Sequence, residues 1–393
     1  MGNMYPPHHL GGYELTWRSS VAHLQALGHE VEVLTTDYRA SDPVAAAGAP
    51  EPTTIHRELR WYWRDHDFPR ISLRERIALE RHNARVLTRR LAAARPHVVA
   101  WWALGGMSLS LVERVRRAGI PAVGIVGDLW MLYGPQVDAW TRAVARVGSL
   151  GGRAAAAAGL PAGAKLAPAA RWLFVSDYVR RQAVERVGAL PGATVRHPGI
   201  DPQTFPTAEP QPWRGRLLYA GRIDERKGVR TAIEALAELA PEVSLRVVGD
   251  GDPDHRRMLA ALAEDLGLGP RVALEPGVGQ RELAGIYAAA DVLVFPVLWS
   301  EPWGLVPLEA MATGTLVLAT GTGGSGEYLR DRENCLLFEP GDVKGLARSA
   351  GALAGDPALR ARLREGGLAT AARLTEHAYN AAIERALLDA ACA

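Results

Sequence analysis

The sequence is poor in cysteine and in lysine, and each shortage excludes a class of protein. Cys335 and Cys392 are the two cysteines in 393 residues, too few for the disulfide framework of a small secreted domain. The three lysines are Lys165, Lys227 and Lys344, and arginine supplies the other positive charges. A formal net charge of +2 and the absence of basic blocks exclude a nucleic-acid-binding tail or a strong overall field.

Long apolar runs are also missing. Residues 1–12 lack the basic patch followed by an apolar stretch that marks a signal peptide. The longest apolar stretch, 98–112, is interrupted by Gly105 and Gly106 and is too short to cross a bilayer core of roughly 30 Å. We therefore expect a cytoplasmic protein, and peripheral contact with the inner membrane face stays open.

What the sequence does contain is a regular alternation of strand-like and helix-like segments. Hydrophobic residues make up 48% of the chain, enough for two cores. Strands separated by helices predict parallel sheets covered on both faces, hence an α/β fold. Helices are expected at 13–27 and 74–95 and from residues 229, 254, 280 and 305. Strands are expected at 29–36, 97–102, 121–126, 171–176, 194–197, 216–221, 244–251, 271–277, 291–296 and 315–320.

The segment 198–213 carries five prolines and little periodicity, which is typical of a connector between domains. The predicted division is an N-terminal domain over 1–200, a linker over 201–213 and a C-terminal domain over 214–374. The last helix, 375–393, is predicted to return to the N-terminal domain. The Ala/Gly-rich stretch 148–168 is interpreted as a variable loop or a loose helix.

Ligands of open parallel sheets bind at the carboxyl ends of the strands. The strand 216–221 is followed by a loop that carries Arg222 and Lys227. An arginine fork and a mobile lysine charge at such a place suit a phosphate ligand. The alternative is an ordinary solvated charged loop.

Two carboxylates follow the strand 291–296. Glu301 lies in the loop and Glu309 in the next helix, so that both could accept hydrogen bonds from one polyhydroxyl ligand. The alternative, a first-turn glutamate that complements the helix dipole, explains one acid and not both. Gly323 and Gly324 in a neighbouring turn allow a close backbone approach.

The N-terminal half places Gly11 and Gly12 directly before a helix. Amides at such a position form a second candidate anion site. A glycine pair before a helix is by itself more often a plain turn.

The segments YPPHHLGGYEL, GRIDERKG and SEPWGLVPLEAMATG, in this order and spacing, resemble family 4 glycosyltransferases over essentially the whole chain. The resemblance implies the GT-B fold, in which two Rossmann-like domains with parallel sheets face each other across a cleft. It also implies a retaining, hexosyltransferase-type enzyme of carbohydrate biosynthesis. Such an enzyme moves a sugar from a nucleoside-diphosphate sugar to a hydroxyl acceptor.

The resemblance assigns a role to each candidate residue. Arg222 and Lys227 would hold the donor diphosphate and stabilise the charge that develops as it leaves. Glu301 would bind hydroxyls of the transferred sugar. The remaining donor contacts would come from Glu309 to the ribose, the amides of Gly304 and Leu305 to the phosphate, Gly277 and Val278 to the base, and Gly11 and Gly12 from the other domain.

No metal or resident cofactor is expected, because two fixed cations and helix amides would take the place of a divalent metal. The nucleoside-diphosphate sugar is the co-substrate. The pairs Asp250/Asp252 and Asp65/Asp67 resemble metal motifs but lack further oxygen ligands nearby in the sequence.

The sequence departs from the family pattern at two places. Only four residues precede Tyr5, so the first strand of the N-terminal sheet is expected to be missing, with unpaired edges beside it. Gly127 stands where the family often has a histidine that contacts the donor sugar. The following Asp128 would orient the sugar or acceptor, or would merely cap the strand end.

The acceptor and the oligomeric state are not predicted. The segment 57–76 mixes arginines with Trp61, Tyr62, Trp63 and Phe68. It suits a phosphorylated or aromatic acceptor, an anionic membrane surface, or simply a surface helix. Two alternatives to an active transferase remain, namely an inactive nucleotide-sugar-binding partner subunit and a GT-B phosphorylase or epimerase. A pyridoxal-dependent phosphorylase would need a Schiff-base lysine, for which Lys165 and Lys344 are poorly placed.

Overall fold

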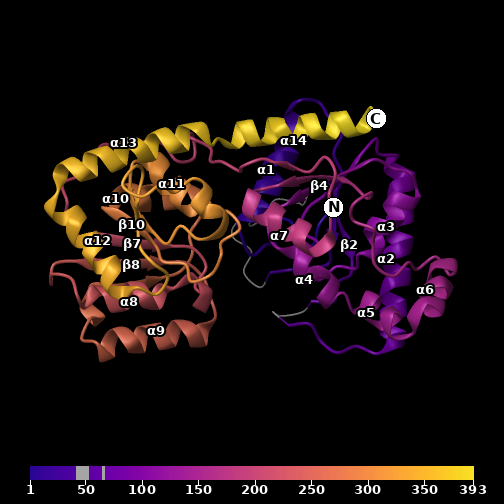
Figure 1. The fold of residues 1–393 in the computed structure, drawn as a ribbon, viewed down its shortest axis with the longest axis horizontal. Helices are drawn as coiled ribbons and strands as arrows, with labels where there is room; N and C mark the ends of the chain where they lie inside the picture. Colours follow the sequence, from indigo (N-terminus) through magenta and orange to yellow (C-terminus); the bar gives the residue numbers. More distant parts are fainter. Residues whose placement is uncertain (41–52, 64–66) are drawn as a thin grey trace. The chain divides into compact units, whose positions relative to one another are not determined.

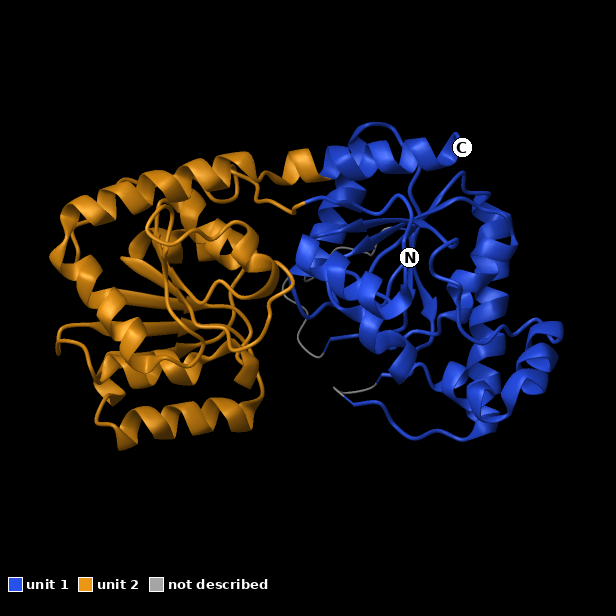
Figure 2. Cartoon of the chain, viewed as in Figure 1, with its two compact units in different colours: residues 1–196, 380–393 blue, residues 197–379 orange. Residues whose placement is uncertain are grey.

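The computed structural model describes residues 1–40, 53–63 and 67–393, and the chain divides into two compact units (Figure 2). Unit 1 comprises Met1–Arg196 together with Asn380–Ala393. Unit 2 comprises His197–Tyr379. Each unit has its own parallel sheet with helices around it, as the alternating pattern predicted.

Unit 1 contains a four-stranded parallel sheet in the order β3-β4-β5-β6 and a parallel pair, β1-β2. The strands are β1 (Val33–Thr36), β2 (Ile55–Leu59), β3 (Val99–Trp101), β4 (Ala122–Val126), β5 (Arg171–Phe174) and β6 (Thr194–Val195). The helices are α1 (Gly12–Ala26), α2 (Leu73–Ala94), α3 (Ser110–Arg117), α4 (Trp130–Val137), α5 (Ala139–Arg146), α6 (Gly148–Ala157) and α7 (Asp177–Val187).

Residues Met1–Asn3 lie between β1 and β3. Their backbone groups bond to Leu34 of β1 and to Trp102 and Ala103, directly after β3, at N···O distances of 2.8 to 3.3 Å. The edges expected to be unpaired are therefore hydrogen-bonded at these positions.

Unit 2 contains a six-stranded parallel sheet in the order β12-β11-β10-β7-β8-β9. Helix α8 packs on α9 and α12, while α11 packs on α10 and α13 (Figure 1). The strands are β7 (Arg216–Ala220), β8 (Ser244–Val248), β9 (Val272–Glu275), β10 (Val292–Phe295), β11 (Leu316–Ala319) and β12 (Leu336–Leu337). The helices are α8 (Val229–Leu236), α9 (Pro253–Asp265), α10 (Gln280–Ala289), α11 (Val306–Thr313), α12 (Val343–Gly355) and α13 (Pro357–Arg373).

The last helix, α14 (Glu376–Ala391), contributes its residues from Asn380 onward to unit 1. The Asn380 carboxamide oxygen accepts a hydrogen bond from Ser20 Oγ of α1 at 2.7 Å. Glu384 lies 3.1 Å from Nε2 of His29. Polar contacts thus fix this helix on the N-terminal unit.

Each of the ten expected strands contains a strand of the structure, and the six expected helices also form. The surface-helix alternative for 57–76 is wrong, because β2 runs to Leu59 and α2 begins only at Leu73, capped by Ser72 Oγ. The sequence pattern did not predict β2, whose strand partner in the described part of the chain is β1. Part of the 148–168 stretch forms the helix α6.

Candidate functional site

Two loops meet at the carboxyl-terminal edge of the unit 2 sheet, where the strands end, because β7 and β10 are direct neighbours. The loop after β7 carries the predicted cations, and the loop after β10 carries Glu301. Gly228 has φ +70°, and a Cβ there would lie 1.9 Å from the carbonyl oxygen of Pro296. The amide of Leu298 bonds to the carbonyl of Arg226 at 2.8 Å. Glycine at 228 thus lets the two backbones touch.

The centre of this edge is an ion pair between Lys227 and Glu301. Nζ of Lys227 lies 2.7 Å from Oε2 of Glu301, and the two side chains are only 18% and 11% exposed. The indole of Trp299 donates to the same oxygen at 2.9 Å. The guanidinium of Arg226 stacks over the Trp299 ring, 4.7 Å from its centroid. The predicted phosphate-binding lysine and sugar-binding glutamate are therefore side by side and orient each other.

Arg222 lies on the same loop and is 41% exposed, which leaves it accessible to an anion. Its Nε donates to Asp224 Oδ2 at 3.0 Å. The other oxygen of Asp224 accepts from the backbone amide of Arg226 at 3.0 Å and so fixes the turn. Burial acts to raise the pKa of Asp224, but the Arg226 hydrogen bond and the nearby cations lower it overall. Asp224 thus stays ionised and holds the arginine in place.

Glu309 lies in the first turn of α11 and is buried. Its Oε2 accepts a hydrogen bond from the hydroxyl of Tyr287 in α10 at 2.8 Å. Burial raises the pKa of Glu309 to about 7, although the Tyr287 hydrogen bond opposes the change. The carboxyl therefore changes protonation near neutral pH, which its sequence position does not reveal.

Gly304 and Leu305 form the entry to α11. Leu305 is its N-cap and makes no side-chain capping bond. Gly304 has φ +84° and accepts a hydrogen bond from the Tyr328 hydroxyl at 2.6 Å. The helix dipole and amides at this end favour an anion. Gly323 approaches the same loop, since a Cβ there would lie 2.5 Å from the carbonyl oxygen of Glu301.

Gly277 and Val278 follow β9, on the far side of β8 from Arg222. The Gly277 amide donates to Oδ1 of Asp250 at 2.9 Å. Asp252 caps α9 by accepting from two backbone amides. Both carboxylates of the Asp250/Asp252 pair therefore accept hydrogen bonds from backbone amides.

Within the described ranges, no group of three or more His, Cys, Asp and Glu side chains could hold a metal ion. The Asp65/Asp67 pair lies partly outside the described residues. The metal-independence of the reaction remains a prediction.

Two side chains of this edge were missed by the sequence analysis, namely Trp299 and Tyr287. Trp299 stands two residues before Glu301, so an indole donor next to the carboxylate was the available signal. Tyr287 comes from α10, and nothing in its local sequence indicates a contact with Glu309.

The predicted site residues of unit 1 form hydrogen bonds with other residues of the same unit. Gly11 is the N-cap of α1, and its amide already bonds to Oε2 of Glu14 at 3.0 Å. Asp128 accepts from the Trp130 amide at 3.1 Å and from the Tyr133 hydroxyl at 2.8 Å. Burial raises the pKa of Asp128, and both hydrogen bonds oppose it. These bonds order the start of α4, so a further catalytic role of Asp128 stays a prediction.

Gly127 is explained by its neighbour Tyr13. A Cβ at 127 would lie 2.4 Å from Cε2 of the Tyr13 ring. The Tyr13 hydroxyl donates to the carbonyl of Ile125. The tyrosine ring therefore occupies the space that a larger residue at 127 would need.

We expect Gly127→Ala to lower the free energy of unfolding by about 1–3 kcal/mol, because the Tyr13 ring must move. Thermal unfolding monitored by circular dichroism measures the loss. Gly152→Ala in α6 is the matched control, since its Cβ would meet nothing closer than 3.9 Å. Equal melting temperatures for Gly127→Ala and the unaltered protein would contradict the crowding at 127.

Across residues 1–40, 53–63 and 67–393, no helix combines the length and apolar character needed to cross a bilayer.

Residues 209–369 match the sequence model of the family described as Glycosyl transferases group 1. A D-inositol 3-phosphate glycosyltransferase of Xylanimonas cellulosilytica is 37% identical over 193 residues, which are 45% of this chain and 46% of that protein. The chain thus spans about half the length of the curated relatives it matches.

Solved structures match over nearly the whole chain. Anabaena HepE, in a crystal structure with UDP and glucose, has a TM-score of 0.70 and 18% identity, over 97% of this chain and 96% of that one. WaaG, a glycosyltransferase involved in lipopolysaccharide biosynthesis, has a TM-score of 0.68 and 20% identity, over 98% of both chains. The two Rossmann-like units therefore have the GT-B fold, as predicted.

Proposed function

We propose that the protein is a glycosyltransferase that moves a sugar from a nucleoside-diphosphate sugar to a hydroxyl acceptor. The observation that carries the proposal is the Lys227–Glu301 pair at 2.7 Å, with Arg222 on the same strand-end loop. Both loops lie inside the segment that matches the group 1 family, 209–369. A fold alone would not support an activity, whereas paired groups suited to phosphate and to sugar hydroxyls do.

In the proposed reaction, the donor diphosphate lies against Arg222, Lys227 and the amides of Gly304 and Leu305. Negative charge grows on the diphosphate as the bond to the sugar breaks, and these groups are already oriented to stabilise it. Glu301 accepts from sugar hydroxyls. Its pairing with the lysine keeps the carboxylate fixed before the donor arrives.

The finer assignments belong to the same proposal. Retention of configuration and membership of family 4 rest on the sequence resemblance. Independence from a divalent metal is proposed because fixed cations and helix amides face the phosphate position. The acceptor is proposed to bind in unit 1. The reaction is proposed to take place in the cytoplasm. Contact with the inner membrane face is compatible with this proposal, because the chain carries many arginines.

The first test is thermal unfolding with UDP, GDP, ADP and dTDP and their sugars, each with and without Mg²⁺. A nucleotide at about 100 times its Kd is expected to stabilise the folded protein by ~2.7 kcal/mol, without metal. UDP is the first choice because the HepE crystals contained it. The double variant Arg222→Ala/Lys227→Ala should lose the shift.

The absence of a shift with every nucleotide would overturn the donor-site assignment. A shift that needs Mg²⁺ would overturn metal-independence alone. Binding of a donor sugar without turnover, with every acceptor class tried, would instead identify the inactive partner subunit.

A further inference from the structure

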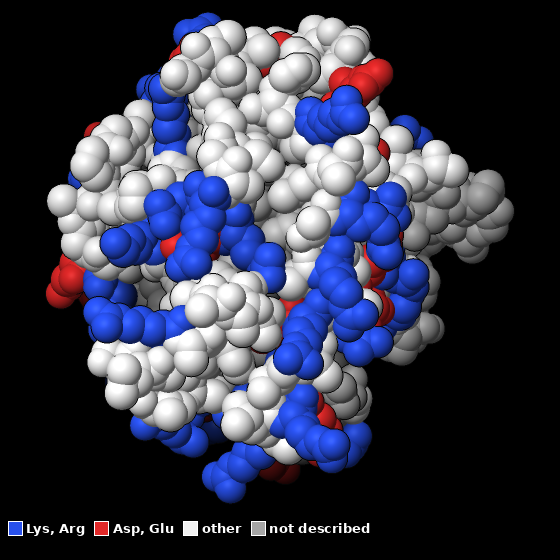
Figure 3. All heavy atoms as spheres, turned by 90° about the vertical axis from the view of Figure 1, so that its right-hand side faces the viewer, with Lys and Arg blue, Asp and Glu red and all other residues white. Residues whose placement is uncertain are grey.

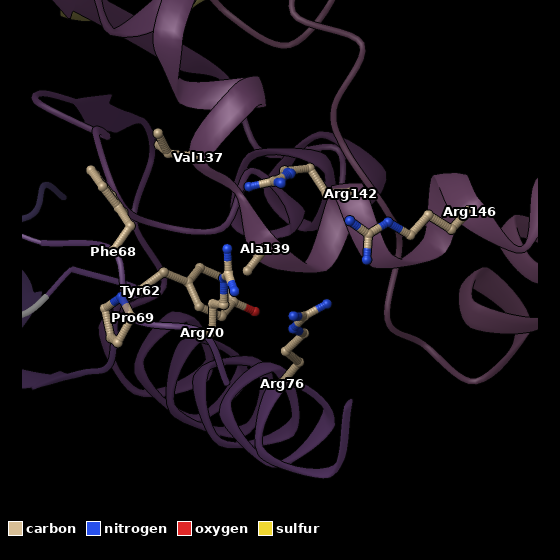
Figure 4. A pocket seen from close by; sticks show the side chains of 9 residues that line it. All are labelled: Tyr62, Phe68, Pro69, Arg70, Arg76, Val137, Ala139, Arg142 and Arg146. Atoms are coloured by element: carbon tan, nitrogen blue, oxygen red, sulfur yellow. The ribbon is translucent and has the colours of Figure 1, made fainter. Parts of the chain in front are cut away.

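A pocket of about 320 Å³ lies on unit 1, between the start of α2 and the helix α5. Four arginines line it, two beside or in the first turn of α2 and two on α5 (Figure 4). They are Arg70, Arg76, Arg142 and Arg146. The donor site of the proposed function uses none of them.

One wall of the pocket is formed by Tyr62 and Phe68. The Tyr62 amide donates to the carbonyl of Gly106 at 2.8 Å, which holds this wall on the loop that follows β3. A Cβ on Gly106 would lie 3.3 Å from the Phe68 ring. The wall therefore belongs to the carboxyl-end side of the unit 1 sheet, where ligands of such sheets bind.

The four arginines have no ion pair and no side-chain hydrogen bond within the part of the chain that the structure describes. Nε of Arg76 is buried and has no partner there. Other arginines of α2 do find acids, since Arg89 and Arg90 both pair with Glu58. Four like charges around one cavity repel each other, and a buried donor without an acceptor costs free energy. An anion in the pocket would relieve both.

Two buried acids beside this wall, Glu80 and Asp138, form their hydrogen bonds with groups other than the arginines. Glu80 accepts from the Tyr62 hydroxyl at 2.7 Å and from Ser110 Oγ at 2.6 Å. Burial raises the pKa of Glu80 to about 7, so it is partly neutral near physiological pH. Asp138 caps α5 through the amides of Trp140 and Thr141. The two acids thus organise the pocket wall and the start of α5, and the positive charge of the pocket remains.

We propose that this pocket binds the phosphate groups of a small phosphorylated ligand. Guanidinium forks match phosphate oxygens two at a time, and Val137 and Ala139 supply apolar surface for the carbon part of such a ligand. The volume lies at the lower end of the range of small-molecule sites. Arginine and lysine side chains, with acidic side chains among them, also gather on the face of the molecule that Figure 3 shows.

Anion binding itself does not depend on the proposed function. If the proposed function holds, the small phosphorylated ligand is the acceptor of the transferred sugar. The experiment must therefore separate the pocket from the donor site, which also holds cations that bind phosphate.

The test uses full-length Arg222→Ala/Lys227→Ala protein, in which the donor cations are removed, and calorimetric titration with inorganic pyrophosphate. Binding is expected to persist in this background. Adding Arg76→Ala or Arg142→Ala is expected to weaken it roughly tenfold, as the loss of one bidentate contact would. Arg85→Ala is the matched control, because Arg85 is an exposed arginine of α2 outside the pocket. It should leave the affinity unchanged.

Three results would overturn the proposal. Pyrophosphate binding that disappears with Arg222 and Lys227 would assign it to the donor site. Equal weakening by Arg85→Ala would indicate diffuse surface charge.

The third result that would overturn the proposal comes from sedimentation with phosphatidylglycerol vesicles. If Arg76→Ala abolishes vesicle binding while no variant binds pyrophosphate, the arginines serve lipid headgroups rather than a small ligand.

A failure of the proposed function looks different. Nucleotides would then give no thermal shift in the unaltered protein, while pyrophosphate would still bind through Arg76 and Arg142.

Discussion

Replacing Lys227 by alanine is expected to lower turnover about 100- to 1000-fold with the fold intact, as the loss of one fixed electrostatic group does in other enzymes. Lys227 is half-buried and already held by Glu301 at 2.7 Å, so its charge needs no reorganisation when the diphosphate leaves. The effect should fall mainly on kcat, because charge on the diphosphate grows in the transition state. The release of nucleoside diphosphate from the donor, with acceptor or with water, measures it.

The control is Lys344→Ala, which removes an exposed lysine of α12 in the same unit. It should leave both turnover and the melting temperature unchanged. A second variant tests whether the unpaired charge of Glu301 accounts for any loss of stability in Lys227→Ala. In Lys227→Ala/Glu301→Gln, the glutamate no longer carries an uncompensated charge, so stability should recover and turnover should not. Turnover of Lys227→Ala equal to that of the unaltered protein would remove the lysine from the mechanism.

The strands of unit 2 could be predicted because β7 and β10 are buried on both faces and appear as short continuous apolar runs. The sequence also indicated the loops that follow them, and hence Arg222, Lys227 and Glu301. The contact between Lys227 and Glu301 could not be predicted from either loop. It exists because β7 and β10 are neighbours in the sheet, and strand order is a property of the whole fold.

The roles of residues that depend on tertiary contacts could not be predicted from the sequence. The Tyr13 ring lies beside Gly127, although the two positions are more than a hundred residues apart. The sequence therefore indicated a missing histidine contact at 127, whereas in the structure the Tyr13 ring fills that space. The segment 57–76 was ambiguous for a related reason. Its aromatic residues pack on the loop after β3 in an irregular conformation, and neither a helical nor a strand period describes them.

Replacing Glu309 by alanine is expected to raise the donor KM about 10- to 100-fold with little change in kcat. A carboxylate that accepts from ribose hydroxyls contributes roughly 1.5–3 kcal/mol, and it does so equally before and during the reaction. Loss of such uniform binding appears in KM alone. Glu282→Ala, which removes an exposed acid at the start of α10, should leave KM unchanged.

The buried position of Glu309 adds a pH dependence that alanine scanning alone would not show. Because burial raises its pKa to about 7, the carboxyl is largely protonated below that pH and ionised above it. In the proposed function the ionised form accepts from both ribose hydroxyls, so the donor KM of the unaltered protein should fall as pH rises from about 6 to about 8. Glu309→Gln keeps the shape, retains a bond to Tyr287 and cannot titrate, so its KM should be higher and flat across the same range. An unchanged KM in both variants would confine Glu309 to fixing α10 on α11 through Tyr287, and the ribose would then need another acceptor at this edge of the sheet.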